Sequence, residues 1–523
     1  MELKQRRIAR PLAPMQATVL SSTLQGIDGL LVEVEVDLAF GGLARFPVVG
    51  LAAGAVKESK DRVRAALKNS GYKVYAKRIT VNLAPADVRK DGAAFDLPIA
   101  LGMLAASGQL PKALLDAYAS VGELSLDGRV KTVRGALPIA AAVRSRGLRG
   151  VLVPPANARE AAVIEGIEVI PVPTLTDAFE FLRGDRSIAP ARVDVDALFR
   201  AEARFHADFA DVRGQDAAKR ALEVAAAGGH NVIMVGPPGT GKTMLAKRLA
   251  TILPPLTLEE SLEATRVHSV LGLMDGRSLV ATRPFRAPHH TISDAGLIGG
   301  GSVPRPGEVS LAHHGVLFLD ELPEFRKNVL EVLRQPLEER RITIARAVGA
   351  VTFPANLMLI AAMNPCPCGY RGDAQRTCSC TIQQVQRYRS RVSGPLLDRI
   401  DIQVEVRAVP FRDLAARNAE ESSATLRARV DRARQRQLAR FAGRPLFCNA
   451  QMASRDLSAY CAVDPAAERL LQQAMERLAL SARAYTRILK VARTIADLAD
   501  SAPITAAHVA EAVQYRSLDR ALP

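Results

Sequence analysis

The sequence predicts a multidomain α/β protein: an α+β domain, an α/β domain on a parallel sheet, and a C-terminal helical domain. Its 523 residues correspond to about three domains at roughly 150 residues each. Val32, Val34 and Val36 alternate with acidic residues, which predicts a strand with one solvated face. Further along, the apolar stretch Val232–Val235 leads through a glycine-rich loop into a helical pattern. Beyond residue 410 the pattern is almost purely helical.

The first domain is expected over residues 15–190. After the first strand, residues 56–70 have the apolar spacing of a helix that ends at Gly71, and a second alternating strand follows at residues 79–83. Residues 182–190 are rich in turn formers and predict a linker. Short apolar segments predict further strands around residues 121–133, 150–154 and 169–172.

The second domain is expected over residues 191–410 and the third over residues 411–523. In the second, the apolar strands Val316–Leu319 and 357–362 are typical of the centre of a parallel sheet. In the third, an alanine- and arginine-rich helical stretch at 412–441 precedes an amphipathic one at 465–499.

The composition is that of a basic globular protein. Lysine and arginine number 70 against 54 acidic residues, and the resulting charge of +16 favours a polyanionic partner such as nucleic acid. Aromatic residues are 4% and tryptophan is absent, so we expect contacts with the nucleic-acid backbone rather than stacking on bases. No apolar stretch approaches the roughly 18–20 residues of a membrane span, so no membrane partner is expected.

The cysteines and the N-terminus indicate the compartment. Six cysteines are too few for a disulfide framework, and four lie between Cys366 and Cys380, which favours a reducing cytoplasm. Residues 1–14 are basic but lack the apolar core of a secretory signal. We expect a disordered extension there, with a transit peptide as the alternative.

A glycine-rich loop predicts a site for nucleotide phosphates. Residues 236–243 match G-x-x-x-x-G-K-[ST] between a predicted strand and a predicted helix. Backbone N–H groups of such a loop surround the phosphates, its lysine reaches the β and γ oxygens, and its last hydroxyl binds Mg²⁺. The ATP-binding residues predicted here are Gly236, Pro237, Pro238, Gly239, Thr240, Gly241, Lys242 and Thr243.

Two acidic residues follow the apolar strand Val316–Leu319. Asp320 suits the Mg²⁺ shell, together with Thr243. Glu321 suits polarisation of the attacking water. The loop and the acidic pair together predict an ATP hydrolase that uses Mg²⁺.

Four cysteines predict a metal site. Cys366 and Cys368 form one close pair, and Cys378 and Cys380 form another. Four thiolates suit tetrahedral Zn²⁺, which would hold together a connecting loop with almost no apolar content. The C-x-C spacing is less common than C-x₂-C, so reduced thiols without a metal, or a redox switch, are the alternatives.

The loop, the acidic pair, Asn364 and the stretch Ser393-Gly-Pro-Leu-Leu-Asp-Arg-Ile-Asp401 together resemble AAA+ ATPases of the magnesium-chelatase branch. The resemblance implies an AAA+ domain at 191–410, with the cysteine cluster as an insertion, and a helical lid at 411–523. It implies that Asn364 is sensor 1 and helps to position the water. It implies that Arg399 is an arginine finger directed at the γ-phosphate of a neighbouring subunit. A salt-bridge arginine is the alternative.

The same resemblance implies a sensor 2 arginine in the helical domain. Arg483, in the stretch Ser481-Ala-Arg-Ala, is expected to reach back to the nucleotide. Arg487 and Arg493 are competitors for this role, and a plain salt bridge is again the alternative.

A more specific segment runs from Arg283-Pro-Phe-Arg-Ala-Pro-His-His290 through three glycines to Ala312-His-His314-Gly. With the rest of the chain from about residue 15, it is similar to the bacterial ComM/YifB family. This resemblance implies a homo-hexameric ATPase that acts on DNA, with branch migration in natural transformation as its role. The paired histidines are expected to be structural, with a metal site as the alternative.

The first domain resembles the proteolytic domain of Lon, through residues 121–130 and 152–157. In that family a nucleophilic serine lies in a D-G-P-S-A-G turn and a lysine about forty residues on activates it. Here Ala94 stands at the serine position and Leu137 at the lysine position. We therefore expect a Lon-protease-like fold without proteolysis.

A basic hairpin precedes the sensor 1 strand and is the expected DNA contact. Gly349 lies in its turn region, and its arginines are Arg340, Arg341 and Arg346. In similar AAA+ motors such a hairpin faces the central pore. The alternative is a solvated basic edge that blocks sheet aggregation.

These observations favour an ATP-dependent DNA motor, a helicase or branch-migration translocase acting on single-stranded, duplex or branched DNA. The alternative is a chelatase-type ATPase that remodels a protein partner. An ATP-dependent protease is opposed by Ala94 and Leu137.

Overall fold

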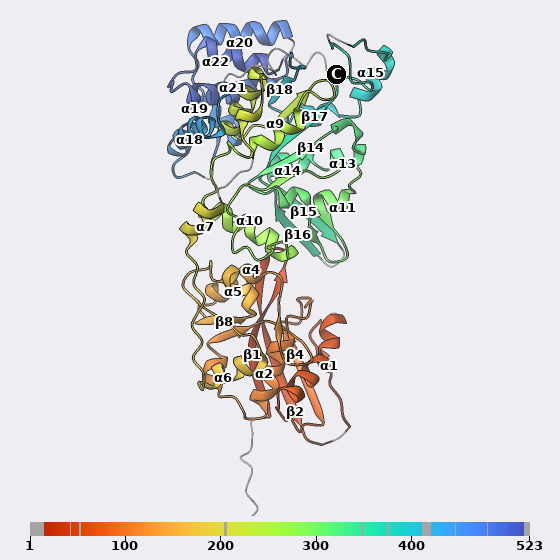
Figure 1. The fold of residues 1–523 in the computed structure, drawn as a ribbon, viewed down its shortest axis with the longest axis vertical. Helices are drawn as coiled ribbons and strands as arrows, with labels where there is room; N and C mark the ends of the chain where they lie inside the picture. Colours follow the sequence, from red (N-terminus) through yellow and green to blue (C-terminus); the bar gives the residue numbers. More distant parts are fainter. Residues whose placement is uncertain are drawn as a thin grey trace, which may run out of the picture. The chain divides into compact units, whose positions relative to one another are not determined.

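The computed structural model describes residues 15–516 except 42, 52–53, 91, 203–206, 347–348, 374–375, 411–419, 445 and 479. The extension expected at 1–14 lies outside the described residues. The chain divides into two compact units, drawn in Figure 1. The first comprises Met1–Arg200 and Thr265–Val280, and the second comprises Ala201–Ala264 and Ala281–Pro523.

A mixed seven-stranded sheet forms the first unit. The alternation in the sequence explains its centre, because Val32, Val34 and Val36 of β2 are fully buried while Glu33 and Asp37 are exposed. β1 and β4 pair antiparallel with β2, and the strands beyond β1 run parallel to one another. In spatial order the strands are β3 (Val48–Val49), β4 (Arg78–Ala84), β2 (Asp28–Ala39), β1 (Gln16–Gln25), β5 (Tyr118–Ser120), β8 (Gly150–Val153) and β9 (Glu168–Pro171).

Helices pack against this sheet. Every residue of α2 (Asp96–Ala106) is buried, including Asp96, whose carboxylate accepts hydrogen bonds from Arg62 of α1 at 2.7 and 3.1 Å. A small hairpin pairs β6 (Glu123–Leu124) with β7 (Val130–Lys131). The helices are α1 (Gly54–Asn69), α3 (Lys112–Leu115), α4 (Ala136–Ser145), α5 (Pro155–Ala161) and α6 (Leu175–Arg183), and α7 (Val195–Glu202) follows them in the chain.

The second unit is built on a five-stranded parallel sheet, as the apolar strands of the sequence predict. Because every strand runs the same way, the carboxyl ends of β10, β17 and β14 meet at one edge. In spatial order the strands are β11 (Phe285–Arg286), β14 (Val316–Leu319), β17 (Met358–Met363), β10 (Val232–Val235) and β18 (Ile402–Glu405).

Helices and two hairpins complete this part of the chain. The larger hairpin pairs β15 (Arg341–Arg346) with β16 (Gly349–Pro354), and the smaller pairs β12 (Gly299–Gly300) with β13 (Arg305–Pro306). The helices are η1 (Phe209–Asp211), α8 (Asp216–Gly228), α9 (Lys242–Leu249), α10 (Leu258–Leu271), α11 (Asp294–Ile298), α12 (Glu308–Leu311), η2 (Leu322–Glu324), α13 (Lys327–Glu331), α14 (Arg334–Glu339), α15 (Ile382–Arg389) and α16 (Gly394–Leu397).

The C-terminal region is helical, as predicted. Figure 1 shows α18 to α22 grouped together. The amphipathic stretch at 465–499 forms two helices rather than one, and the helices share one hydrophobic core with β10 and β17. The elements are α18 (Ser423–Arg440), η3 (Asn449–Gln451), α19 (Ser454–Tyr460), α20 (Pro465–Leu478), α21 (Ala482–Leu498) and α22 (Ala506–Gln514).

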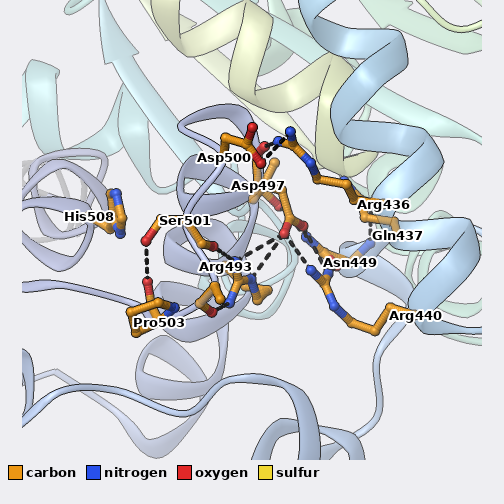
Figure 2. Close-up of polar contacts among 12 residues, drawn as sticks. Arg436, Gln437, Arg440, Asn449, Arg493, Asp497, Asp500, Ser501, Pro503 and His508 are labelled. Carbon is orange, nitrogen blue, oxygen red and sulfur yellow. Dashed lines mark hydrogen bonds and ion pairs between the residues drawn. The ribbon is translucent and has the colours of Figure 1, made fainter.

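A buried carboxylate joins three of these elements. Asp497 of α21 is 1% exposed, and Arg440 of α18, Arg493 of α21 and Asn449 of η3 all donate to it (Figure 2). Arg493 also donates to the carbonyl oxygens of Ser501 and Ala502, past the end of α21. Asp497 therefore neutralises two arginines inside the helical region.

Asp497→Asn is expected to lower the free energy of unfolding by about 3–5 kcal/mol, because it leaves Arg440 and Arg493 without a counter-charge where water is excluded. Denaturant titration of the full chain measures this loss. Asp500→Asn is the matched control, because the Asp500 side chain is 80% exposed and its pair with Arg436 lies at the surface. Equal losses in the two variants would contradict the interpretation.

Candidate nucleotide-binding site

The glycine-rich loop connects β10 to α9 at the carboxyl edge of the parallel sheet. Gly239 and Gly241 have φ values of +80° and +89°, a conformation that side-chain-bearing residues rarely adopt. Lys242 begins α9, and its ammonium donates to the carbonyl oxygens of Gly236 and Pro237 at 2.7 and 2.8 Å. The ammonium is thus held over the loop in which phosphates would lie.

Three strands bring the predicted partners to this loop. The Thr243 hydroxyl donates to Asp320 Oδ2 at 2.6 Å, which joins the start of α9 to the end of β14. The Lys242 ammonium donates to Asn364 Oδ1 at 3.2 Å, just after β17. A hydroxyl beside a carboxylate is the ligand pair that Mg²⁺ takes in phosphate-binding loops.

Glu321 lies at the solvent-facing side of this group. Its backbone has a φ of +52°, and its N–H donates to Asp320 Oδ1 at 3.0 Å. The side chain is 58% exposed, and His290 Nδ1 lies 3.7 Å from its carboxylate. An exposed carboxylate beside the Mg²⁺ ligands can accept a proton from water.

Burial affects the charge of the loop lysine. It lowers the pKa of Lys242, while the nearby carboxylates of Asp320 and Glu321 act in the opposite direction. A bound triphosphate would add further negative charge, so the geometry favours an anion beside this ammonium.

The four cysteines of the predicted metal site come together. The Sγ of Cys366 lies 3.4 Å from that of Cys368 and 3.6 Å from that of Cys378. The Sγ of Cys380 accepts a hydrogen bond from the Cys368 N–H at 3.3 Å, and all four sulfurs lie within 4.8 Å of one another. Four sulfurs about 2.3 Å from one central Zn²⁺ would have separations close to these.

The cysteines of the cluster differ in their electrostatic environment. Burial raises the pKa of Cys366 to about 12, whereas the backbone N–H of Tyr370 lowers that of Cys368 to about 6. Several thiolates cannot lie this close without a positive charge among them. The donor set and its geometry are therefore compatible with a structural zinc ion.

The cysteine loop packs on the phosphate loop. A Cβ on Gly369 would lie 2.6 Å from Cδ of Pro238, so only glycine permits this approach. Cys366 follows Asn364 by two residues, and the carbonyl oxygen of Pro365 accepts a hydrogen bond from Arg389 of α15 at 3.3 Å. The cysteine loop thus follows Asn364 closely in the chain and packs on Pro238 of the phosphate loop.

Arg399 lies at a different place in the second unit. Its guanidinium contacts Glu338 and the carbonyl oxygen of Pro395, and its side chain is 11% exposed. It lines a cavity of about 430 Å³, called the basic cavity, together with Arg340, Arg434 and Lys490. No residue of 236–243, all of which are described, lines this cavity.

The sensor 2 candidates are held apart from the chain's own phosphate loop. Arg483 also lines the basic cavity, 3.5 Å from Asp398, so the structure does not show the expected reach back to the nucleotide. Arg487 pairs with Asp401, and Arg493 is buried in the Asp497 network. The position of α21 explains this, because Arg483 stands at its first turn, beside the segment that carries Arg399.

The hairpin arginines separate into two groups. Arg341 and Arg346 are exposed on β15. Arg340 caps α14 with a φ of +56°, is half-buried, and lines the basic cavity instead. The sequence places the three arginines on one surface, but the turn between α14 and β15 redirects the first of them.

The second histidine pair forms a closed hydrogen-bond group with Glu263 of α10. His313 and His314 direct their Nε2 atoms at the Glu263 carboxylate, at 3.0 and 2.7 Å. His313 Nδ1 accepts the Asn356 N–H at 3.0 Å, which assigns its proton to Nε2. Burial lowers the pKa of His313 to about 4, so it is neutral at pH 7. A protonated Nε2 cannot bind a metal, so the contacts favour the structural role.

In the first unit, Leu137 and Ala94 occupy the positions at which the resemblance to Lon would place the catalytic lysine and serine. Leu137 is fully buried, and its backbone N–H donates to Glu160 at 3.0 Å. Ser269, from the segment 265–280 that belongs to this unit, donates to the same carboxylate. Asp91, which opens the corresponding turn, lies outside the described residues, and Ala94 carries no nucleophile.

Among the described residues, no helix has both the length and the apolar character that a membrane crossing needs.

Comparisons with known proteins match nearly the whole chain. Family models described as magnesium chelatase subunit ChlI match residues 208–414, subunit ChlI of Mg-chelatase residues 34–157, and the ChlI C-terminal region residues 420–516. The chain is 45% identical to competence protein ComM of Haemophilus influenzae, covering 97% of this chain and 98% of that protein. It is 43% identical to YifB of Salmonella typhimurium, with the same coverage of both chains.

A further similarity concerns the first domain. Lon protease 2 of Bacillus subtilis is 31% identical over 147 residues, which cover 27% of this chain and 26% of that protein. The likeness to Lon is therefore partial. With similarity across nearly their full lengths to ComM and YifB, and three ChlI models in order, the chain belongs to the ComM/YifB family of magnesium-chelatase-like AAA+ proteins.

Proposed function

We propose that this protein is an ATP-driven motor that acts on DNA as a homo-hexameric ring. ATP hydrolysis is supported by two contacts, of Thr243 with Asp320 and of Lys242 with Asn364. They bring the ends of β10, β14 and β17 together around one phosphate loop. The similarity to a competence protein and the charge of +16 support DNA as the substrate.

ATP and Mg²⁺ would be held by the loop and the acidic strand end. Thr243 and Asp320 supply Mg²⁺ ligands, the N-terminus of α9 and Lys242 hold the phosphates, and Glu321 accepts the proton of the attacking water. When bound, Mg²⁺ neutralises charge that develops on the phosphate oxygens. Asn364 lies where it can orient that water.

DNA would contact the hairpin of β15 and β16. Arg341 and Arg346 are exposed on one of its strands and can neutralise backbone phosphates. Such contacts do not depend on the DNA sequence, and the affinity that they provide falls steeply as the salt concentration rises. In a ring, each copy would present one hairpin to a shared central strand.

The alternative is an ATPase that remodels a protein for metal insertion, as the chelatase names of the matching family models indicate. The hairpin arginines and the net charge favour DNA over this alternative. We also propose a structural Zn²⁺ on Cys366, Cys368, Cys378 and Cys380, which would fix the sensor 1 segment against the phosphate loop.

DNA is expected to stimulate ATP hydrolysis, whereas an unfolded protein is not, because only DNA offers phosphates to the hairpin. Arg341→Gln combined with Arg346→Gln should remove the stimulation and leave basal hydrolysis intact. Steady-state phosphate release, with and without single-stranded, duplex and branched DNA, measures both effects.

Two variants of the nucleotide site serve as controls for this assay. Lys242→Ala should abolish hydrolysis, and Glu321→Gln should bind ATP without hydrolysing it. Stimulation by protein but not by DNA would favour the remodelling alternative. Near-normal hydrolysis in either control would contradict the site assignment.

Purified protein is expected to contain one zinc per chain by elemental analysis. Cys368→Ser combined with Cys378→Ser should lose the metal and weaken ATP binding, because the cluster supports Pro238 through Gly369. Cys461→Ala is the control, since Cys461 is buried outside the cluster. Well under one zinc per chain in the unaltered protein would show that the thiols are free.

Arg399→Ala is expected to fold and bind ATP yet to lose hydrolysis by a factor on the order of 10³ to 10⁵, as for other arginine fingers. Mixing it with Lys242→Ala chains should restore part of the activity, because an intact Lys242 site can then meet an intact Arg399 across an interface. Phosphate release over a series of mixing ratios measures this rescue. Normal hydrolysis by an Arg399→Ala monomer would rule out the finger.

A further inference from the structure

The basic cavity carries an unusual balance of charge. Seven cationic and four anionic side chains line its volume of about 430 Å³, and all of them belong to the second unit. It opens beside the amino ends of the strands, since Gly315, Asn231 and Met358 line it just before or at the start of β14, β10 and β17. The phosphate loop lies at the opposite edge of the same sheet.

Each of the four acidic residues already has an arginine partner. Two of these pairs are held by charge-assisted hydrogen bonds with little exposure to water. The pairs are Arg283 with Glu260, Arg399 with Glu338, Arg483 with Asp398, and Arg487 with Asp401. All four carboxylates of the cavity are therefore paired with an arginine. Three of the seven cations are left outside these pairs.

The remaining three, Arg340, Arg434 and Lys490, form no ion pair with a described residue. Arg434 donates to the carbonyl oxygens of Ala226 and Ala227, and Lys490 donates to that of Ala450. Burial lowers the pKa of all three cations. They come from three separate elements, the end of α14, α18 and α21, yet face one volume.

We propose that the basic cavity is a binding site for an oligophosphate group, with Arg340, Arg434 and Lys490 as its ligands. A triphosphate carries about three to four negative charges, which matches the three cations that form no direct ion pair with a described residue. Guanidinium groups bind phosphate oxygens in a fork, and ammonium groups bind them as a point charge. Carboxylates act on Arg434 and Lys490 only from beyond ion-pair distance, Glu260 and Asp431 on the first and Asp401 on the second, so a bound anion would be the direct ionic partner of both.

The group can come from two sources with the same chemistry. One is the triphosphate of ATP bound to a second copy of this chain. This source rests on the proposed ring, in which Arg399 of the same cavity would reach across a subunit interface. The other is a free oligophosphate or nucleotide that regulates the enzyme. In both cases the site is separate from the chain's own phosphate loop.

The test uses the full-length Lys242→Ala chain, first checked to bind no fluorescent ATP analogue, and sodium tripolyphosphate as the probe. Calorimetry is expected to show one tripolyphosphate bound per chain. Adding Arg340→Gln or Lys490→Gln should each weaken this binding about tenfold or more, because each removes a charge-assisted contact. Circular dichroism and thermal melting confirm that the variants are folded, and Arg340→Lys should recover part of the affinity.

Arg432→Gln is the matched control, because Arg432 is exposed on α18, the helix that carries Arg434. Its tripolyphosphate affinity should equal that of Lys242→Ala alone. Absence of binding to Lys242→Ala, or equal binding with and without Arg340→Gln, would overturn the proposal. Because the probe needs neither DNA nor hydrolysis, failure of the DNA-motor function would leave this result unaffected.

Hydrolysis assays distinguish the two sources. If the ligand is a neighbour's ATP, Arg340→Gln in an otherwise unaltered chain should lose hydrolysis, and added Lys242→Ala chains should restore part of it. If the ligand is free, Arg340→Gln should hydrolyse ATP normally while it still loses tripolyphosphate binding.

Discussion

The hydrogen bond between Thr243 and Asp320 depends on the parallel register of β10, β17 and β14, and the nucleotide site depends on that register. Asp320 and Asn364 follow directly after β14 and β17, and the glycine-rich loop that leads to Thr243 follows β10. Because parallel strands end at a common edge of the sheet, residues that are far apart in the sequence lie close together there. A strand running the other way would carry Asp320 or Asn364 to the opposite edge.

Several of the protein's many arginines pair with carboxylates that are buried in the second unit. Asp497 binds two arginines and an asparagine in the helical region, and Asp401 binds Arg487 while it also accepts the Asn231 N–H. Charges removed from water are stable only when they are paired and hydrogen-bonded. The basic cavity departs from this rule, which is why its three cations point to a ligand rather than to stability.

The cysteine loop and the Glu263 group show two different uses of potential metal ligands. The four sulfurs have the spacing and number that zinc requires, and their loop presses on Pro238 of the phosphate loop. His313 and His314 also approach a carboxylate, but the Asn356 N–H assigns the His313 proton to the atom that a metal would need. Hydrogen-bond direction thus separates two clusters that look alike by residue type.

Local patterns in the sequence determined the strands β2, β4, β10 and β14, the phosphate loop and the acidic pair, because alternation and glycine spacing act over a few residues. They also indicated the cysteine cluster. Only the tertiary structure decided that Arg340 turns away from the hairpin, that Arg483 lies beside Arg399, and that segment 265–280 joins the first unit. The sequence did not distinguish Arg434 or Lys490 as ligands of a cavity, because helix arginines and lysines are usually solvated. Their role depends on which distant carboxylates are already paired, and packing alone settles that.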